Sequence, residues 1–145
     1  MQGYRREVEV RWSDLDPNFH LRHSVYYDWG AFVRLSFLNE NGLTPELMRQ
    51  NNLGPILFRE ECVFKREIVF DDSIDVTLQL SKSRRDNSRW TMMHEIWKSN
   101  DKLSAIITID GAWIDTRLRK LTAPTTFVQQ MFEAIPKAEG FIWVD

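Results

Sequence analysis

The sequence predicts an α+β fold in which a curved antiparallel sheet encloses one long helix, and three observations lead to this prediction. Apolar and polar residues alternate over long stretches after residue 55, which is typical of half-buried strands. Turn-like segments join these stretches without intervening helices, a pattern that favours antiparallel hairpins. Residues 25–38 form a helical stretch with few polar side chains, which indicates a helix covered by other structure on nearly all sides.

The first strand is expected before this helix, where Val8, Val10 and Trp12 alternate with charged residues. Pro17 and Asn18 then predict a turn. Further strands with the same alternation are expected over residues 55–64, 74–81, 90–97 and 103–114. In the strand that starts at residue 55, the residues expected on one face are Ile56, Phe58, Cys62 and Phe64.

Helix boundaries follow from capping residues. Ser24 is the expected N-cap of the long helix, because its hydroxyl can accept a hydrogen bond from a free amide, and Gly42 is the expected stop. A Thr-Pro-Glu segment starts a short second helix over residues 44–50. A last helix is expected over residues 125–135, followed by an irregular segment over residues 136–140.

Composition restricts the class of protein. The length suits one domain over residues 1–145, and a net charge of −2 does not point to nucleic acid. Cys62 is the single cysteine, so nothing indicates an oxidising compartment, and neither a secretory signal nor a membrane-length apolar run is present. We therefore expect a cytoplasmic protein with no membrane partner. Six Trp and nine Phe favour a homo-oligomer.

The most informative motif joins the first strand to the long helix. Asp14 and Asp16 form an Asp-x-Asp pair, and His20 lies four residues further on. The free amides at the start of the next helix, over residues 24–26, carry a positive partial charge. A carboxylate such as Asp16 can attack an activated acyl group or activate a water, and the amides can stabilise the oxyanion that forms. Such a site hydrolyses acyl groups without metal or cofactor.

On these residues the chain resembles the hotdog-fold acyl-CoA thioesterases, specifically the 4-hydroxybenzoyl-CoA thioesterase-like family, over about residues 4–120. The family pattern has Asp-x-Asp after the first strand, then three residues, His-Val-Asn-Asn, and a Tyr two residues further on. Asp14, Asp16, His20 and Tyr26 fall on those positions without gaps. The resemblance implies a hotdog fold, thioester hydrolysis and Asp16 as the catalytic carboxylate. The substrate is then an acyl-CoA or an acyl-carrier-protein thioester, and coenzyme A enters only as part of the substrate.

Three residues depart from the family pattern. Phe19 stands where a small residue precedes the histidine, and Arg22 and His23 replace the two asparagines. Because these positions lie beside the reacting group in the family, they bear on substrate identity.

Each candidate site residue can also be interpreted as an ordinary turn or core residue without a functional role. On the functional reading, we expect Asp16 to serve as nucleophile or general base, with His20 and His23 orienting it or binding substrate. The expected oxyanion contacts come from Ser24, Val25 and Tyr26, and the expected lining of the acyl pocket is Phe19, Tyr26 and Trp29.

Four basic residues are candidates for the phosphates of coenzyme A: Lys65, Arg66, Arg84 and Arg85. Glu60 or Glu61 is a rival catalytic position, since one of two successive strand residues points inward. We expect Asp14 to bond the local turn, and His94 and Cys62 to be structural. Three histidines and one cysteine lack the spacing of a metal site, so no metal is expected.

Two other functions remain open. The first is a hotdog enoyl-CoA hydratase, although the four-residue spacing from Asp16 to His20 and the order of Pro17 and Asn18 differ from the hydratase pattern. The second is a non-catalytic domain that binds an acyl thioester or a protein. Release of free thiol from acyl-CoAs distinguishes hydrolysis from both.

Overall fold

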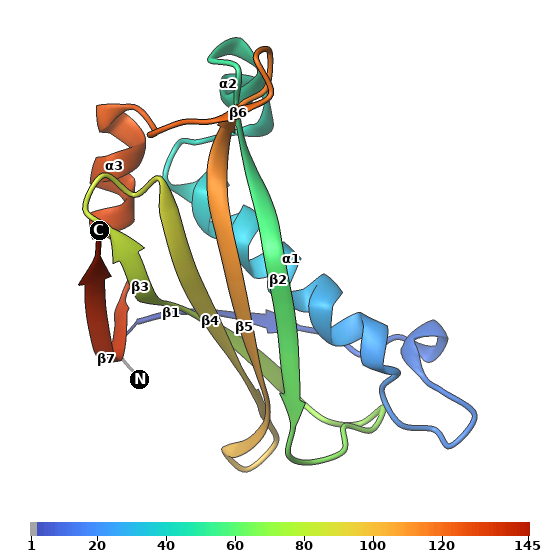
Figure 1. The fold of residues 1–145 in the computed structure, drawn as a ribbon. Helices are drawn as coiled ribbons and strands as arrows, with labels where there is room; N and C mark the ends of the chain where they lie inside the picture. The colour runs from blue at the N-terminus through green and yellow to red at the C-terminus, as the bar shows by residue number, and fades with distance from the viewer. Residues whose placement is uncertain (1–2) are drawn as a thin grey trace.

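The computed structural model describes residues 3–145, in which one curled sheet carries three helices (Figure 1). The strands are β1 Tyr4–Val8, β2 Leu53–Phe64, β3 Ile74–Arg84, β4 Arg89–Lys98, β5 Lys102–Asp115, β6 Lys120–Leu121 and β7 Lys137–Val144. The three α-helices are the long α1 His23–Glu40 and the shorter α2 Pro45–Gln50 and α3 Thr126–Glu133. A short 3₁₀ turn, η1 Trp12–Asp14, precedes them.

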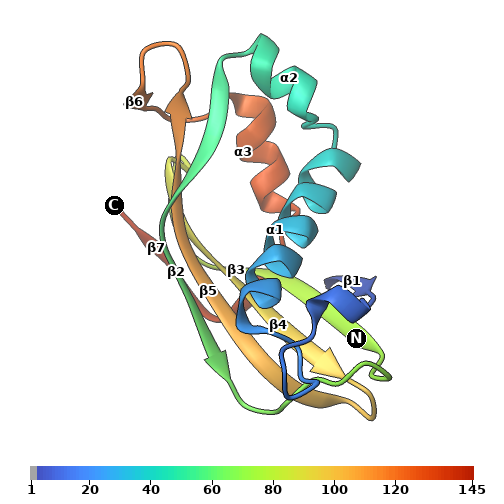
Figure 2. The same cartoon turned by 90° about the vertical axis from the view of Figure 1, so that its right-hand side faces the viewer.

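The main sheet has the strand order β1-β3-β4-β5-β2, with every neighbour in this path antiparallel. All three helices lie on one side of the sheet, and the sheet curls around α1 (Figure 2). This arrangement confirms the predicted hotdog fold. No helix of the described part is long and apolar enough to cross a membrane.

The helix α1 lies on the concave side of the curled sheet, but it is not covered on nearly all sides as predicted, because Phe32 and Leu35 are 44% and 46% exposed. Val25, Val33 and Phe37 are almost completely buried, and they contact a core to which β3, β4 and β5 contribute Ile, Val and Leu side chains. Residues spaced by three and four positions along α1 therefore face the sheet.

The predicted second helix is confirmed as α2, and the hydroxyl of Thr44 caps it by accepting from the amide of Leu47 at 3.1 Å.

The start of the chain corrects two predictions. The strand β1 ends at Val8, and Trp12 lies in η1 with 73% of its surface exposed, so it is not a strand residue. Ser24 is not the N-cap of α1, since the helix begins at His23 and Arg22 occupies the cap position. The hydroxyl of Ser24 instead accepts from the Arg22 guanidinium at 2.6 Å. The helix therefore begins directly after the turn, at His23, rather than after Ser24.

The face predicted for β2 is wrong because the strand contains a β-bulge. Its register against β5 shifts between Leu57 and Arg59. Leu57 lines a cavity against α1, whereas beyond the bulge it is Phe64 that packs edge-on against Tyr26 of α1. An extra residue at a bulge exchanges the two faces of a strand. Ile56 and Phe58 therefore do not share a face with Cys62 and Phe64.

The end of the chain corrects the prediction of an irregular segment. Residues 137–144 form β7, which pairs with β3 in parallel. The strand has few buried side chains, so its apolar alternation is weak and its backbone hydrogen bonds hold it in place.

Candidate active site

An open hollow of about 450 Å³ lies where the start of α1 meets the end of β2. Two backbone contacts shape this region: the first joins the motif to the loop after β2, and the second closes the turn of the motif itself. The amide of Leu21 donates to the carbonyl of Ile68 at 2.8 Å, and Leu15 forms an isolated bridge with Leu21. The side chain of Ile68 is fully buried, which anchors the loop after β2 beside the motif. The lining residues are Asp16, His20, Leu21, His23, Tyr26, Phe64, Lys65, Arg66 and Glu67.

Asp16 lies in this hollow and also organises the turn that precedes the helix. Its Oδ1 accepts from the backbone amides of Asn18 at 2.8 Å and His20 at 3.1 Å. Among the described residues no donor binds its Oδ2. One oxygen of the carboxylate is therefore held by the turn while the other is available to a ligand. Asp16 can thus form the turn and act on a substrate at the same time.

Asp14 has a different role, as predicted. It is 1% exposed and receives the backbone amide of Arg11 at 2.9 Å and the Arg11 guanidinium at 2.8 Å. Hydrogen bonds from Arg11 lower the pKa of the Asp14 carboxyl. Its backbone carbonyl accepts from the amide of Arg22, just before α1. Asp14 is thus a structural anchor of the motif and faces away from the hollow.

The two histidines of the motif both line the hollow, but within residues 3–145 neither imidazole ring bonds the carboxylate of Asp16, which His20 reaches through its backbone amide. The Nε2 atom of His20 lies 3.1 Å from a carboxylate oxygen of Glu67, which follows β2. His23 is exposed at the first position of α1. Glu67 is a site residue that the sequence analysis missed, because only the fold brings it next to His20. The hollow therefore holds two carboxylates, from Asp16 and Glu67.

The free amides of α1 differ from those predicted. The amide of Val25 donates to the carbonyl of Arg22 at 3.1 Å, so it is not free for a ligand. Within residues 3–145, the amides of His23 and Ser24 have no acceptor. These two donors carry the positive partial charge of the helix start; Ser24 is one of the predicted amides, and His23 lies one residue before them.

The aromatic candidates separate into two groups. Tyr26 is 4% exposed, lines the hollow and packs edge-on against Phe64 with ring centroids 4.9 Å apart. Burial, with smaller contributions from nearby acids including Asp16, raises the pKa of Tyr26 to about 12. The structure does not bring Phe19 and Trp29 to the hollow. Phe19 is 63% exposed beside Trp12, and Trp29 is buried on another side of α1.

The basic candidates also fall into two pairs, one at the hollow and one away from it. Lys65 and Arg66 line the hollow, and the Arg66 guanidinium donates to the carbonyl of Leu103 at 2.7 Å. Arg84 is the last residue of β3, and Arg85 stacks on Trp143 near the end of the chain. The eleven residues from Ile74 to Arg84 extend over roughly 33 Å of strand. The structure therefore places Arg84 and Arg85 away from the hollow.

The rival carboxylates Glu60 and Glu61 do not line the hollow around Asp16, and neither do Cys62 and His94. Glu60 points inward, with its carboxylate 3.9 Å from the guanidinium of Arg34, and Glu61 pairs with Arg59 on the opposite face. Burial raises the pKa of the Cys62 thiol to about 11, which leaves it protonated and supports the prediction that it is structural. His94 is fully buried, which supports the prediction that it is structural.

No group of three or more potential metal-ligating side chains occurs within residues 3–145. The hollow instead offers an unbonded carboxylate oxygen of Asp16 and the cationic side chains of Lys65 and Arg66, and it lies beside the start of α1. This set of groups can act on a carbonyl carbon and bind anionic phosphates nearby.

Comparisons with known proteins agree with this chemistry. A sequence model of the Thioesterase-like superfamily matches residues 10–132. A protein of Aquifex aeolicus (strain VF5) described as "Putative esterase" is 30% identical over 82 residues, or 57% of this chain. The matched part spans 62% of that relative, less than two thirds of its length.

Solved structures share the fold at low sequence identity. A hypothetical protein from Staphylococcus aureus, in complex with CoA, matches with a TM-score of 0.83 and 17% identity, covering 94% of this chain and 88% of its own. A DHNA-CoA thioesterase from the same organism gives 0.78 and 18%, covering 90% and 86%. A 1,4-dihydroxy-2-naphthoyl-CoA thioesterase from Synechocystis gives 0.80 and 16%, covering 90% and 96%.

Proposed function

We propose that this chain, which belongs to the thioesterase-like superfamily, hydrolyses acyl-CoA thioesters to a free acid and coenzyme A. The observation that carries the proposal is the carboxylate of Asp16, which lines a hollow at the start of α1 and keeps one oxygen unbonded. The substrates named for similar structures, including dihydroxynaphthoyl-CoA, support a CoA ester as the substrate class.

In the proposed reaction the thioester carbonyl lies against the start of α1. Its developing oxyanion accepts from the amides of His23 and Ser24, which have no acceptor among the described residues. One such donor is typically worth about 3 kcal/mol of barrier. Asp16 either attacks the carbonyl carbon, forming an acyl-enzyme anhydride that water then opens, or removes a proton from an attacking water. In both routes the carbon–sulfur bond breaks and coenzyme A leaves as the thiol.

A thiol-release assay tests the proposal directly. We expect the purified chain to release free thiol from at least one member of a panel of short, long and aromatic acyl-CoAs. An acyl-carrier-protein thioester with the preferred acyl group forms a second arm, which identifies the carrier. Consumption of crotonyl-CoA without thiol release indicates a hydratase instead. Binding of acyl-CoA without any turnover indicates the non-catalytic alternative.

We expect Lys65 to bind the phosphates of coenzyme A, because it lies at the rim of the hollow. Its exposed position limits the effect, so Lys65→Ala should raise KM for the acyl-CoA roughly two- to fivefold, corresponding to about 0.4–1 kcal/mol, with kcat little changed. Steady-state kinetics at low and high salt measure this difference. Arg85→Ala is the matched control, and an equal rise in its KM contradicts the assignment.

We also propose that the chain acts as a homo-oligomer in which a second copy covers β2. This strand of twelve residues lies at the end of the strand order and, within residues 3–145, pairs only with β5. Its exposed apolar side chains include Phe58, Val63 and Phe64, which are 53%, 47% and 52% exposed. A long apolar edge strand tends to associate with another chain.

Light scattering during size exclusion tests the homo-oligomer. We expect a mass of about two or four times the 17.3 kDa of one chain. The Val63→Lys substitution places a charge on the exposed strand and should shift the protein towards the monomer. Leu118→Lys is the control, because Leu118 is 59% exposed but lies in the turn after β5. A wild-type monomer at micromolar concentration rules out the proposed assembly.

A further inference from the structure

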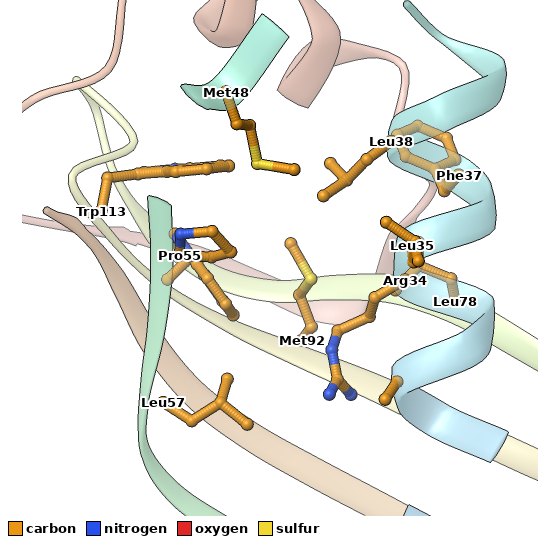
Figure 3. Close-up of a pocket in the computed structure, with 12 residues that line it drawn as sticks. Arg34, Leu35, Phe37, Leu38, Met48, Pro55, Leu57, Leu78, Met92 and Trp113 are labelled. Atoms are coloured by element: carbon orange, nitrogen blue, oxygen red, sulfur yellow. The ribbon is translucent and has the colours of Figure 1, made fainter. Parts of the chain in front are cut away.

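A second cavity lies between α1 and the first half of β2, and it has no lining residue in common with the hollow around Asp16. Its volume is about 220 Å³. An engineered apolar cavity of about 150 Å³ takes up benzene, so this space suits a ligand with a small hydrocarbon body. Figure 3 shows Met48 and Trp113 at one end and the guanidinium of Arg34 at the other.

The walls of this cavity are apolar apart from the guanidinium of Arg34. Leu38, Met48 and Met92 supply aliphatic and thioether surface. Trp90 and Trp113 also line it, and their indole nitrogens are buried without a hydrogen-bond partner within the described residues. Because these nitrogens have almost no accessible surface, the two tryptophans present apolar ring surface to the cavity.

Arg34 supplies the charge that defines the ligand. Its side chain is 14% exposed, and its Nη1 lies 2.9 Å from Nε2 of His94. Because Nδ1 of His94 contacts the carbonyl of Thr77 at 2.8 Å, Nδ1 carries the hydrogen and Nε2 accepts from Arg34. His94 is therefore neutral and does not balance the guanidinium. The nearest carboxylate, that of Glu60, is 3.9 Å away, which is too far for a hydrogen bond.

We propose that this cavity binds a small apolar monocarboxylic acid, with the carboxylate on Arg34 and the hydrocarbon body towards Met48 and Trp113. A guanidinium presents paired N–H donors that match the two oxygens of a carboxylate. The carboxylate of Glu60 competes for the same donors, but its side chain is 28% exposed and can turn to water when the ligand enters. The site does not use Asp16, so it can exist whether or not the proposed hydrolysis does.

Calorimetric titration of the full chain with hexanoate at pH 7 tests the proposal, with tryptophan fluorescence as a second readout. We expect saturable binding of one hexanoate per chain and a change in emission, since two tryptophans line the cavity. Hexan-1-ol has the same tail without the charge, and it should bind at least about tenfold more weakly because a charge-assisted hydrogen bond is lost. Equal affinity for the alcohol, or no binding of hexanoate, overturns the proposal.

Variants locate the binding. Arg34→Met keeps the length of the side chain without its charge and should weaken hexanoate at least about tenfold. Glu60→Gln removes the competing carboxylate and should strengthen hexanoate binding, and this variant decides the question if Arg34→Met does not fold. Asp16→Asn should bind hexanoate like the wild type, which separates this site from the proposed thioesterase site. Unchanged affinity in both Arg34→Met and Glu60→Gln contradicts the proposal.

Discussion

Replacing Asp16 with asparagine should reduce kcat for acyl-CoA hydrolysis by about a thousandfold, since a carboxylate acting as base or nucleophile contributes on this order. The substitution preserves the local structure better than alanine does. Oδ1 of Asp16 accepts from the amides of Asn18 and His20, and the amide oxygen of asparagine can accept the same two hydrogen bonds. A stopped thiol-release assay under substrate saturation measures the change.

Three comparisons make this result specific to Asp16. Asp28→Asn is the matched control, because Asp28 is exposed on α1 and does not line the hollow, so its kcat should equal that of the wild type. Acyl-CoA should still bind Asp16→Asn, since the helix amides and Lys65 remain. Asp16→Ala should lose the same activity and also some stability, because the turn loses its acceptor. Retention of near wild-type turnover in Asp16→Asn refutes the mechanism.

The fold follows closely from the sequence because its signals are local. The alternation in β3, β4 and β5 reflects one face on α1, and the spacing of the buried residues in α1 reflects the side that packs on the sheet, whereas Phe32 and Leu35 of this helix stay exposed. The bulge in β2 has no such signal. A single extra residue between Leu57 and Arg59 exchanges the two faces, and only the pairing with β5 reveals it.

The candidate site was predictable where the motif is contiguous and missed where it is not. Asp16, His20 and His23 lie within eight residues, and the turn brings them to one hollow. Glu67 reaches His20 only through the backbone contact of Leu21 with Ile68, some 47 positions later in the chain. Free amides are equally invisible, since they depend on whether Arg22 or Ser24 occupies the helix cap.

The pairing of Arg34 with His94 shows the same limit most clearly. A charged residue on an otherwise apolar helix is a visible signal, but its partner lies 60 positions away on β4. Their contact requires the close approach of α1 to the sheet at Gly30. A side chain added at Gly30 would place its Cβ 3.0 Å from the His94 ring. The glycine therefore leaves room for a buried neutral histidine beside a cation.

This buried histidine should make the fold sensitive to acid. Burial, together with the adjacent guanidinium of Arg34, lowers the pKa of His94 to about 3, well below the value near 6.5 of an unfolded chain. The native state therefore favours neutral His94, and its contribution to stability is complete above pH 6.5 and declines as the pH falls towards 3. The decline should approach about 1.4 kcal/mol per pH unit below 6.5.

Denaturant unfolding between pH 7 and pH 4.5 isolates this effect, because the lowered pKa of Asp14 places its own contribution at more acid pH. The wild type should lose about 2–3 kcal/mol of its free energy of unfolding over this range. His94→Gln should start less stable at pH 7 and change much less with pH, since an amide does not titrate. His23→Gln is the control and should keep the wild-type slope, because His23 is exposed. If His94→Gln shows the same decline as the wild type, another group must account for the acid sensitivity.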